Sequence, residues 1–255
     1  MVSINREKLD IMKEQIINFL YENEYPEYIK ENFLKNMYDP QRIGCELYQV
    51  YSKFGVVDEE KDMYKYFYSL LKKYKFLNTN CCEVAAGYYP RLAELVYPTL
   101  KANNKTLTIY EPDIISKCLF EIKKELFTMD TDLTKVDTLY GTLTCDATID
   151  IVEKALTEDK NLLIGLCECD HSTEKYPAMS QYYFNLKINN LIKKGITSIK
   201  IDDLPKTYWY ESFCDILKKE YKDEISLLFY PECYDYSAPI LLRMTEEHKR
   251  MHFKK

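Results

Sequence analysis

The amino-acid sequence predicts an α/β protein with a helical region at its N-terminal end. From Asn80 onward, short apolar runs alternate with helical patterns, which is typical of a parallel sheet with crossover helices. The last two apolar runs are joined by the short segment PECYDYSA, which indicates an antiparallel strand pair at the sheet's edge. The first 76 residues contain no run that predicts a strand.

The N-terminal region, residues 1–76, is predicted to be all helical. Its apolar residues recur at helical spacing, and Pro26 and Pro40 break the pattern at intervals suited to short helices. A last helix is expected over residues 58–74. We expect this region to form a cap or lid, and residues 77–255 to form the α/β domain.

Seven apolar runs in the second region are candidate strands. They are Cys81–Val84, Leu107–Tyr110, Leu126–Met129, Val136–Leu143, Leu162–Cys167, Ile225–Tyr230 and Pro239–Met244. Helical patterns separate most of them, including the long stretches 179–194 and 211–221 between the fifth and sixth runs. The prediction is three layers, with helices on both faces of a mostly parallel sheet.

The composition argues against several classes of protein. With 41 acidic and 35 basic residues the net charge is −6, which gives no support for an electrostatic grip on nucleic acid. No apolar run approaches the roughly 18 residues of a membrane span, and the N-terminus has no signal-peptide core. We therefore expect a cytoplasmic protein whose nine cysteines are reduced.

A turn of small residues follows the first predicted strand. The stretch CCEVAAGYYPRLAEL passes from an apolar run through Ala85, Ala86 and Gly87 into a helical pattern. Small residues allow a ligand to approach the backbone, and a helix N-terminus offers free N–H groups. Pro90 suits the first turn of the following helix, because its missing N–H would have no partner there.

An acidic residue ends the next predicted strand. The run LTIYEPD reaches Glu111, at the position where a carboxylate accepts hydrogen bonds from ribose hydroxyls in nucleotide-binding sheets. Together with the turn at Gly87, this residue predicts a ligand of nucleoside type.

These two stretches, EVAAGYYPRLAEL and LTIYEPD, resemble the first two motifs of the class I S-adenosylmethionine-dependent methyltransferases. The stretch VDTLYGTLTCDAT looks like that family's fourth strand. The resemblance spans roughly residues 78–244 and implies a Rossmann-like methyltransferase-type domain. It also implies S-adenosylmethionine as cofactor and methyl transfer as the reaction.

The resemblance also implies which residues bind the cofactor. These are Glu83, Ala85 and Gly87 at the methionine part, Glu111 at the ribose, Asp130 near the adenine, and Thr144 at the end of the fourth strand. From its place in the same turn Ala86 is added as a cofactor-binding residue, and Tyr88 or Tyr89, which flank the turn, is a candidate to cover the cofactor. The acceptor is expected to be a small molecule or a protein rather than nucleic acid.

The sequence departs from the family in two places, and these keep alternatives open. Ala85 stands where the usual loop has its first glycine, and Leu-Thr-Cys-Asp replaces the Asn-Pro-Pro-Tyr signature of many amino-group methylators. A non-catalytic cofactor- or nucleotide-binding module with the same fold is therefore the alternative. A dinucleotide dehydrogenase is disfavoured, because Pro90 occupies the third small-residue position of its fingerprint.

A group of polar residues crowds the predicted carboxyl edge of the sheet. His171 is a candidate general base, since His248 and His252 lie in a charged C-terminal tail, and the carboxylates of Asp146 and Asp170 are the alternatives. The same edge contains Cys145, Cys167, Cys169 and Asp170. Their spacing matches no established zinc motif, so buried thiols are favoured over a metal site, and no metal is predicted.

Overall fold

The N-terminal region of the computed structural model is helical, as predicted. The structure describes residues 3–39, 42–115, 120–166, 208–231 and 238–253, with isolated positions between 189 and 195. The N-terminal elements are α1 (Arg6–Glu22), α2 (Glu27–Asn36), α3 (Cys45–Lys53), η1 (Glu59–Lys61), α4 (Met63–Lys73) and η2 (Phe76–Asn78). Local capping explains two of the boundaries, because the Asn5 side chain accepts from Lys8 N and the Asp62 side chain accepts from Tyr64 N.

The second region contains a seven-stranded sheet in the order β3-β2-β1-β4-β5-β7-β6. The strands are β1 (Cys81–Val84), β2 (Leu107–Tyr110), β3 (Glu121–Lys123), β4 (Thr138–Gly141), β5 (Asn161–Gly165), β6 (Ile225–Leu228) and β7 (Ile240–Arg243). Strands β1 to β5 pair in parallel, whereas β7 pairs antiparallel with both β5 and β6.

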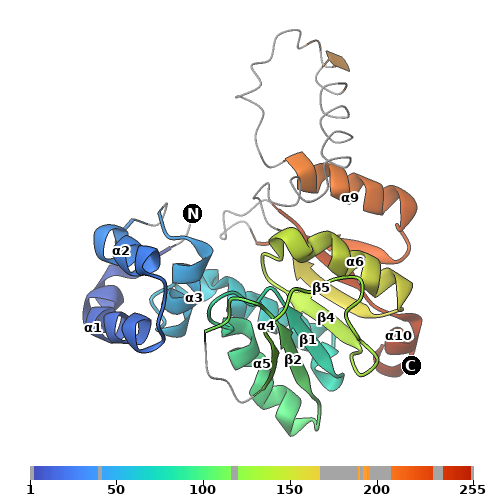
Figure 1. The fold of residues 1–255 in the computed structure, drawn as a ribbon. Helices are drawn as coiled ribbons and strands as arrows, with labels where there is room; N and C mark the ends of the chain where they lie inside the picture. Colours follow the sequence, from blue (N-terminus) through green and yellow to red (C-terminus); the bar gives the residue numbers. More distant parts are fainter. Residues whose placement is uncertain are drawn as a thin grey trace.

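Among the described residues, four helices accompany the strands. They are α5 (Arg91–Ala102), α6 (Thr148–Thr157), α9 (Tyr208–Glu220) and α10 (Glu246–His252). Figure 1 shows α4 and α5 on one side of the sheet and α6 and α9 on the other. These layers, the parallel order and the antiparallel C-terminal pair confirm the predicted fold class, a Rossmann-like fold of methyltransferase type.

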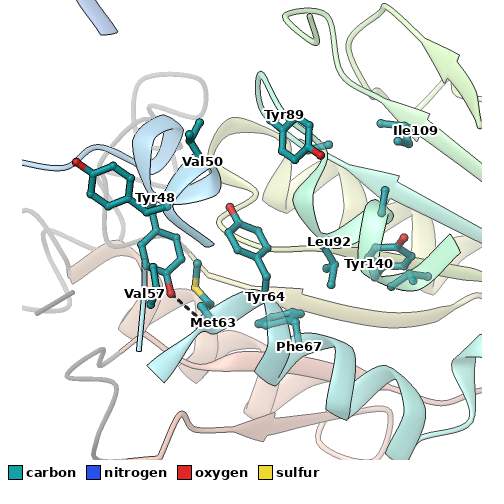
Figure 2. Packing of buried hydrophobic residues seen from close by; sticks show 14 of the residues in the cluster. Tyr48, Val50, Val57, Met63, Tyr64, Phe67, Tyr89, Leu92, Ile109 and Tyr140 are labelled. Atoms are coloured by element: carbon teal, nitrogen blue, oxygen red, sulfur yellow. Dashed lines mark hydrogen bonds between the residues drawn. The ribbon is translucent and has the colours of Figure 1, made fainter. Parts of the chain in front are cut away.

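Alternation along β1 divides the apolar residues between two cores. Cys81 faces the core that includes α1 to α5, whereas Cys82 and Val84 face the core formed with α6 and α9. In Figure 2, Phe67 of α4 and Leu92 of α5 lie in the first core. That core is continuous from α1 to the sheet, so the N-terminal helices and the strands share one buried interior.

The third predicted strand is wrong in position. The structure places β3 at Glu121–Lys123, and Leu126 in the predicted run 126–129 is 72% exposed. β3 pairs with β2 at the edge of the sheet, with its residues exposed or half-buried. An edge strand in that environment needs no apolar run, so the apolar pattern gave no signal for it.

The C-terminal tail also differs from the prediction. His248 is 1% exposed, and its Nε2 lies 2.8 Å from Tyr74 O, so this part of the tail belongs to the buried structure. The predicted helix at 179–194 lies outside the described residues except for isolated positions. In the part of the chain that the structure places, no helix is long and apolar enough to cross a bilayer.

Candidate functional site

A cavity of about 360 Å³ lies at the carboxyl ends of the central strands. The strand order reverses between β1 and β4, and ligands of open parallel sheets bind beside such a reversal. Residues that follow β1, β2 and β4 line the cavity, together with residues of α3 and α4. The lining residues include Gln49, Tyr64, Ala85, Gly87, Tyr88, Glu111, Asp113, Leu143, Thr144 and Cys145.

The backbone around this cavity adopts conformations that side chains disfavour. Ala85 has φ +57° and Gly87 has φ +70° in the loop after β1, while Leu143 (φ +56°) and Cys145 (φ +37°) follow β4. A left-handed conformation costs an L-residue about 1–2 kcal/mol. Such strain concentrates at functional sites, where surrounding contacts over-determine the backbone. The loop therefore holds the backbone of Ala85 in the left-handed region although its side chain disfavours that conformation.

Gln49, in α3, holds the loop after β1. Its Nε2 donates to Ala86 O at 2.7 Å, and its Oε1 accepts from Tyr89 N at 3.2 Å. A Cβ on Gly87 would lie 2.4 Å from Gln49 Nε2. The glycine is therefore required by the close approach of a side chain from the helical region.

Glu111, at the end of the neighbouring strand β2, meets the loop directly. Gly87 N donates to Glu111 Oε2 at 2.8 Å, and Asp113 N donates to Oε1 at 3.0 Å. Burial raises the pKa of Glu111 above its ordinary value, and these two backbone N–H groups partly offset that rise. The structure thus brings Gly87 and Glu111 to one wall of the cavity.

Glu83 occupies a different place from the one that the resemblance implies. It points into the first core beside Tyr140 and the first turn of α5, and it is 1% exposed. Burial raises its pKa to about 8, an effect that Tyr140 and the Ala93 N–H oppose and the Glu111 charge reinforces. Among the described residues, none provides a hydrogen-bond partner for Glu83 Oε2. Glu83 therefore lies behind the cavity wall.

The other predicted cofactor residues are divided among several environments. Tyr88 lines the cavity, and its hydroxyl lies 3.2 Å from the hydroxyl of Tyr28 in α2. Thr144 also lines it, and its Oγ1 lies 2.8 Å from Thr148 Oγ1. Ala86 is buried, and its carbonyl oxygen accepts a hydrogen bond from Gln49 Nε2.

Asp130 lines a separate cavity of about 540 Å³ beside β2 and β3. The two cavities share Tyr110 and Leu126 as lining residues, so they are neighbours at the same edge of the sheet. The structure therefore does not bring Asp130 together with Gly87 and Glu111.

Of the two candidate catalytic residues, Asp146 and His171, the structure describes only the backbone of Asp146. Asp146 lies in η3 (Cys145–Ala147), beside the cavity, but its side chain is outside the described part. His171, Cys167, Cys169 and Asp170 lie outside the described residues altogether.

The buried thiols of Cys81 and Cys82 fit a packing role. Burial raises the pKa of the Cys81 thiol to about 12, and it raises the pKa of the Cys82 thiol well above its ordinary value. Within the described residues, no group of three or more potential ligands could hold a metal ion. Cys145 lines the cavity.

No sequence pattern indicated Gln49 or Tyr64 as site residues. Gln49 donates to Ala86 O, 37 positions further along the chain, and no pattern in the helical region indicates such a contact. Tyr64 is 3% exposed, lines the cavity and has a pKa that burial raises well above the ordinary value. Only the structure shows that every residue of α3 from Leu47 to Ser52 is buried.

The sheet order defines a methyltransferase-like Rossmann fold, with a cavity at the strand-order reversal. The sequence matches no protein-family model and no curated protein. A crystal structure of an S-adenosylhomocysteine-bound Podospora anserina methyltransferase, PaMTH1, matches with 12% identity and a TM-score of 0.43. That match covers 96% of this chain and 99% of the other. A similarity this low assigns no activity, substrate or cofactor to this chain.

Proposed function

We propose that the chain is a methyltransferase that binds S-adenosylmethionine in the cavity beside β1 and β2. The observation that carries the proposal is the 2.8 Å hydrogen bond from Gly87 N to Glu111 Oε2, at the wall of that cavity. The cavity volume of about 360 Å³ lies within the usual range for small-molecule sites.

The residues present fit the cofactor. Each oxygen of Glu111 accepts one backbone N–H and keeps a further lone pair, which a ribose hydroxyl can use. The strained loop at Ala85 and Gly87 would face the methionine part, and Tyr88 would cover it. Asp130 would reach the adenine only if the ligand extends into the neighbouring cavity.

When bound, S-adenosylmethionine would supply a methyl group that its positively charged sulfur makes electrophilic. An aligned nucleophile can attack the carbon of that methyl group. The protein then has to align the acceptor, exclude water and accept a proton. Asp146 and His171 remain our candidates for the proton acceptor. We propose a small molecule or a protein as the methyl acceptor, in keeping with the net charge of −6.

The first test is calorimetric titration of the whole chain with S-adenosylmethionine and S-adenosylhomocysteine. Both ligands should bind at submillimolar concentration, because they share the adenosyl group that Glu111 would hold. If neither ligand binds at millimolar concentration, the proposal is wrong. If they bind but no acceptor panel yields S-adenosylhomocysteine, the alternative of a non-catalytic module is favoured.

The Glu111→Ala variant tests the ribose contact. It should weaken S-adenosylhomocysteine binding by about 1.5–3 kcal/mol, roughly 10- to 150-fold, the value of hydrogen bonds to a charged group. The matched control is Glu153→Ala, which removes an exposed carboxylate from α6. Thermal melting should be recorded for both variants, because Glu111 also holds Gly87 N and Asp113 N. Affinity within twofold of the unmodified protein would contradict the assignment.

A further inference from the structure

We propose that Gln49, in α3, is a positioning residue for the cofactor loop, so that the helical region forms part of the binding site. The inference rests on the proposed function, and it deepens it by assigning a role to a residue outside the sheet. Gln49 is 6% exposed and lines the same cavity as Gly87 and Glu111.

Both ends of the Gln49 amide are used on the loop. The donor end binds Ala86 O and the acceptor end binds Tyr89 N, so the amide spans the two residues between them, Gly87 and Tyr88. This pattern requires a donor and an acceptor at fixed separation, which a carboxamide supplies and an ionised carboxylate does not.

The same contact extends to the ribose residue. Gly87 lies against the Gln49 amide on one side and donates its N–H to Glu111 on the other. A shift of the loop at Gln49 would therefore move the donor that orients Glu111. Because the non-glycine residue Ala85 adopts a left-handed conformation, external contacts are needed to keep the loop in this arrangement.

α3 is itself held firmly between α4 and α5. Ser52 Oγ donates to Asp62 Oδ2 at 2.7 Å, and Arg91 Nε donates to Ser52 Oγ at 3.0 Å. Lys53 Nζ donates to the hydroxyl of Tyr89 at 2.5 Å and to Glu94 Oε1 at 2.9 Å. These contacts fix the position of the helix, so its side chain at Gln49 meets the loop as a rigid support.

Two readouts on the Gln49→Ala variant test the inference. S-adenosylhomocysteine affinity should fall roughly tenfold, and hydrogen exchange of the Tyr89 amide in the ligand-free protein should accelerate by about the same factor. The control is Tyr51→Phe, which removes a different buried hydrogen bond of the same helix, the 2.9 Å bond from the Tyr51 hydroxyl to Met37 O. This control should leave both readouts within about twofold, even where it lowers the melting temperature.

The Gln49→Glu variant provides a conservative rescue. Burial raises the pKa of a carboxyl group, so at acidic pH the variant's protonated side chain can donate to Ala86 O and accept from Tyr89 N as glutamine does. At about pH 8.5 the ionised form would repel Ala86 O, and affinity relative to the unmodified protein should fall roughly tenfold. Recovery at the lower pH supports positioning.

The outcomes separate this inference from the proposed function. If the unmodified protein binds no cofactor, the proposed function fails, while Tyr89 exchange still decides whether Gln49 holds the loop. If the cofactor binds and Gln49→Ala changes neither affinity nor Tyr89 exchange, the positioning role is overturned. Equal effects of Gln49→Ala and Tyr51→Phe on both readouts would also overturn it.

Discussion

Replacing Gly87 with alanine is expected to lower the free energy of unfolding by about 2–4 kcal/mol and to remove measurable S-adenosylhomocysteine binding. Gly87 has φ +70°, where a side chain is strained, and its new Cβ would lie 2.4 Å from Gln49 Nε2. Relief of that overlap would break both hydrogen bonds of Gln49 to the loop. Urea unfolding and calorimetric titration measure the two effects.

Gly55→Ala is the matched control for this prediction. Gly55 has a similar φ of +66°, but no atom lies within 4 Å of the Cβ position. The control therefore introduces backbone strain without overlap, and it should cost only about 1 kcal/mol, since alanine also restricts the unfolded chain. Equal losses in the two variants would show that the contact with Gln49 contributes nothing.

Replacing Glu83 with glutamine is expected to stabilise the protein by about 2–4 kcal/mol at about pH 8, and to change little at about pH 4. Burial raises the pKa of Glu83 from 4.5 to about 8. Between these values the folded state keeps a proton that the unfolded state has released, so stability falls as pH rises through this window. Glutamine carries no such proton, and the variant should lack this pH dependence.

Glu94→Gln provides a control of opposite sign. Although burial opposes the effect, Tyr89, Lys53 and Arg91 together hold the pKa of Glu94 below its ordinary value. Its ionised form therefore stabilises the fold above the unfolded pKa, and this contribution is lost as pH falls through the folded pKa. Neutralising Glu94 should lower stability at about pH 8. Urea unfolding at both pH values tests the pair, and a Glu83→Gln effect independent of pH would contradict the linkage.

The central strands could be predicted because they are buried on both faces. The runs 81–84 and 107–110 match β1 and β2 at both ends, since central parallel strands read as continuous apolar stretches. β3 was missed because its sequence, Glu-Ile-Lys, is that of an exposed edge. The misplaced strand also explains why Asp130, expected after it, lies beside a different cavity.

The contact between Gly87 and Glu111 was predictable because parallel strands place their carboxyl ends at one edge of the sheet. The position of Glu83 was not, because alternation along β1 sends its side chain under α5, away from the loop that follows. Gln49 could not be found at all, since its partners are set by how α3 packs against α5, which no local pattern encodes.

The buried interior that runs from α1 through α4 into the sheet limits how this protein can be altered. Grafting a foreign helical segment onto the strands would leave apolar surfaces on both pieces without matching neighbours. Divergence in this chain should therefore proceed by single substitutions where the N-terminal helices pack on the sheet domain. Each substitution would be compensated by a change in the residue that packs against it.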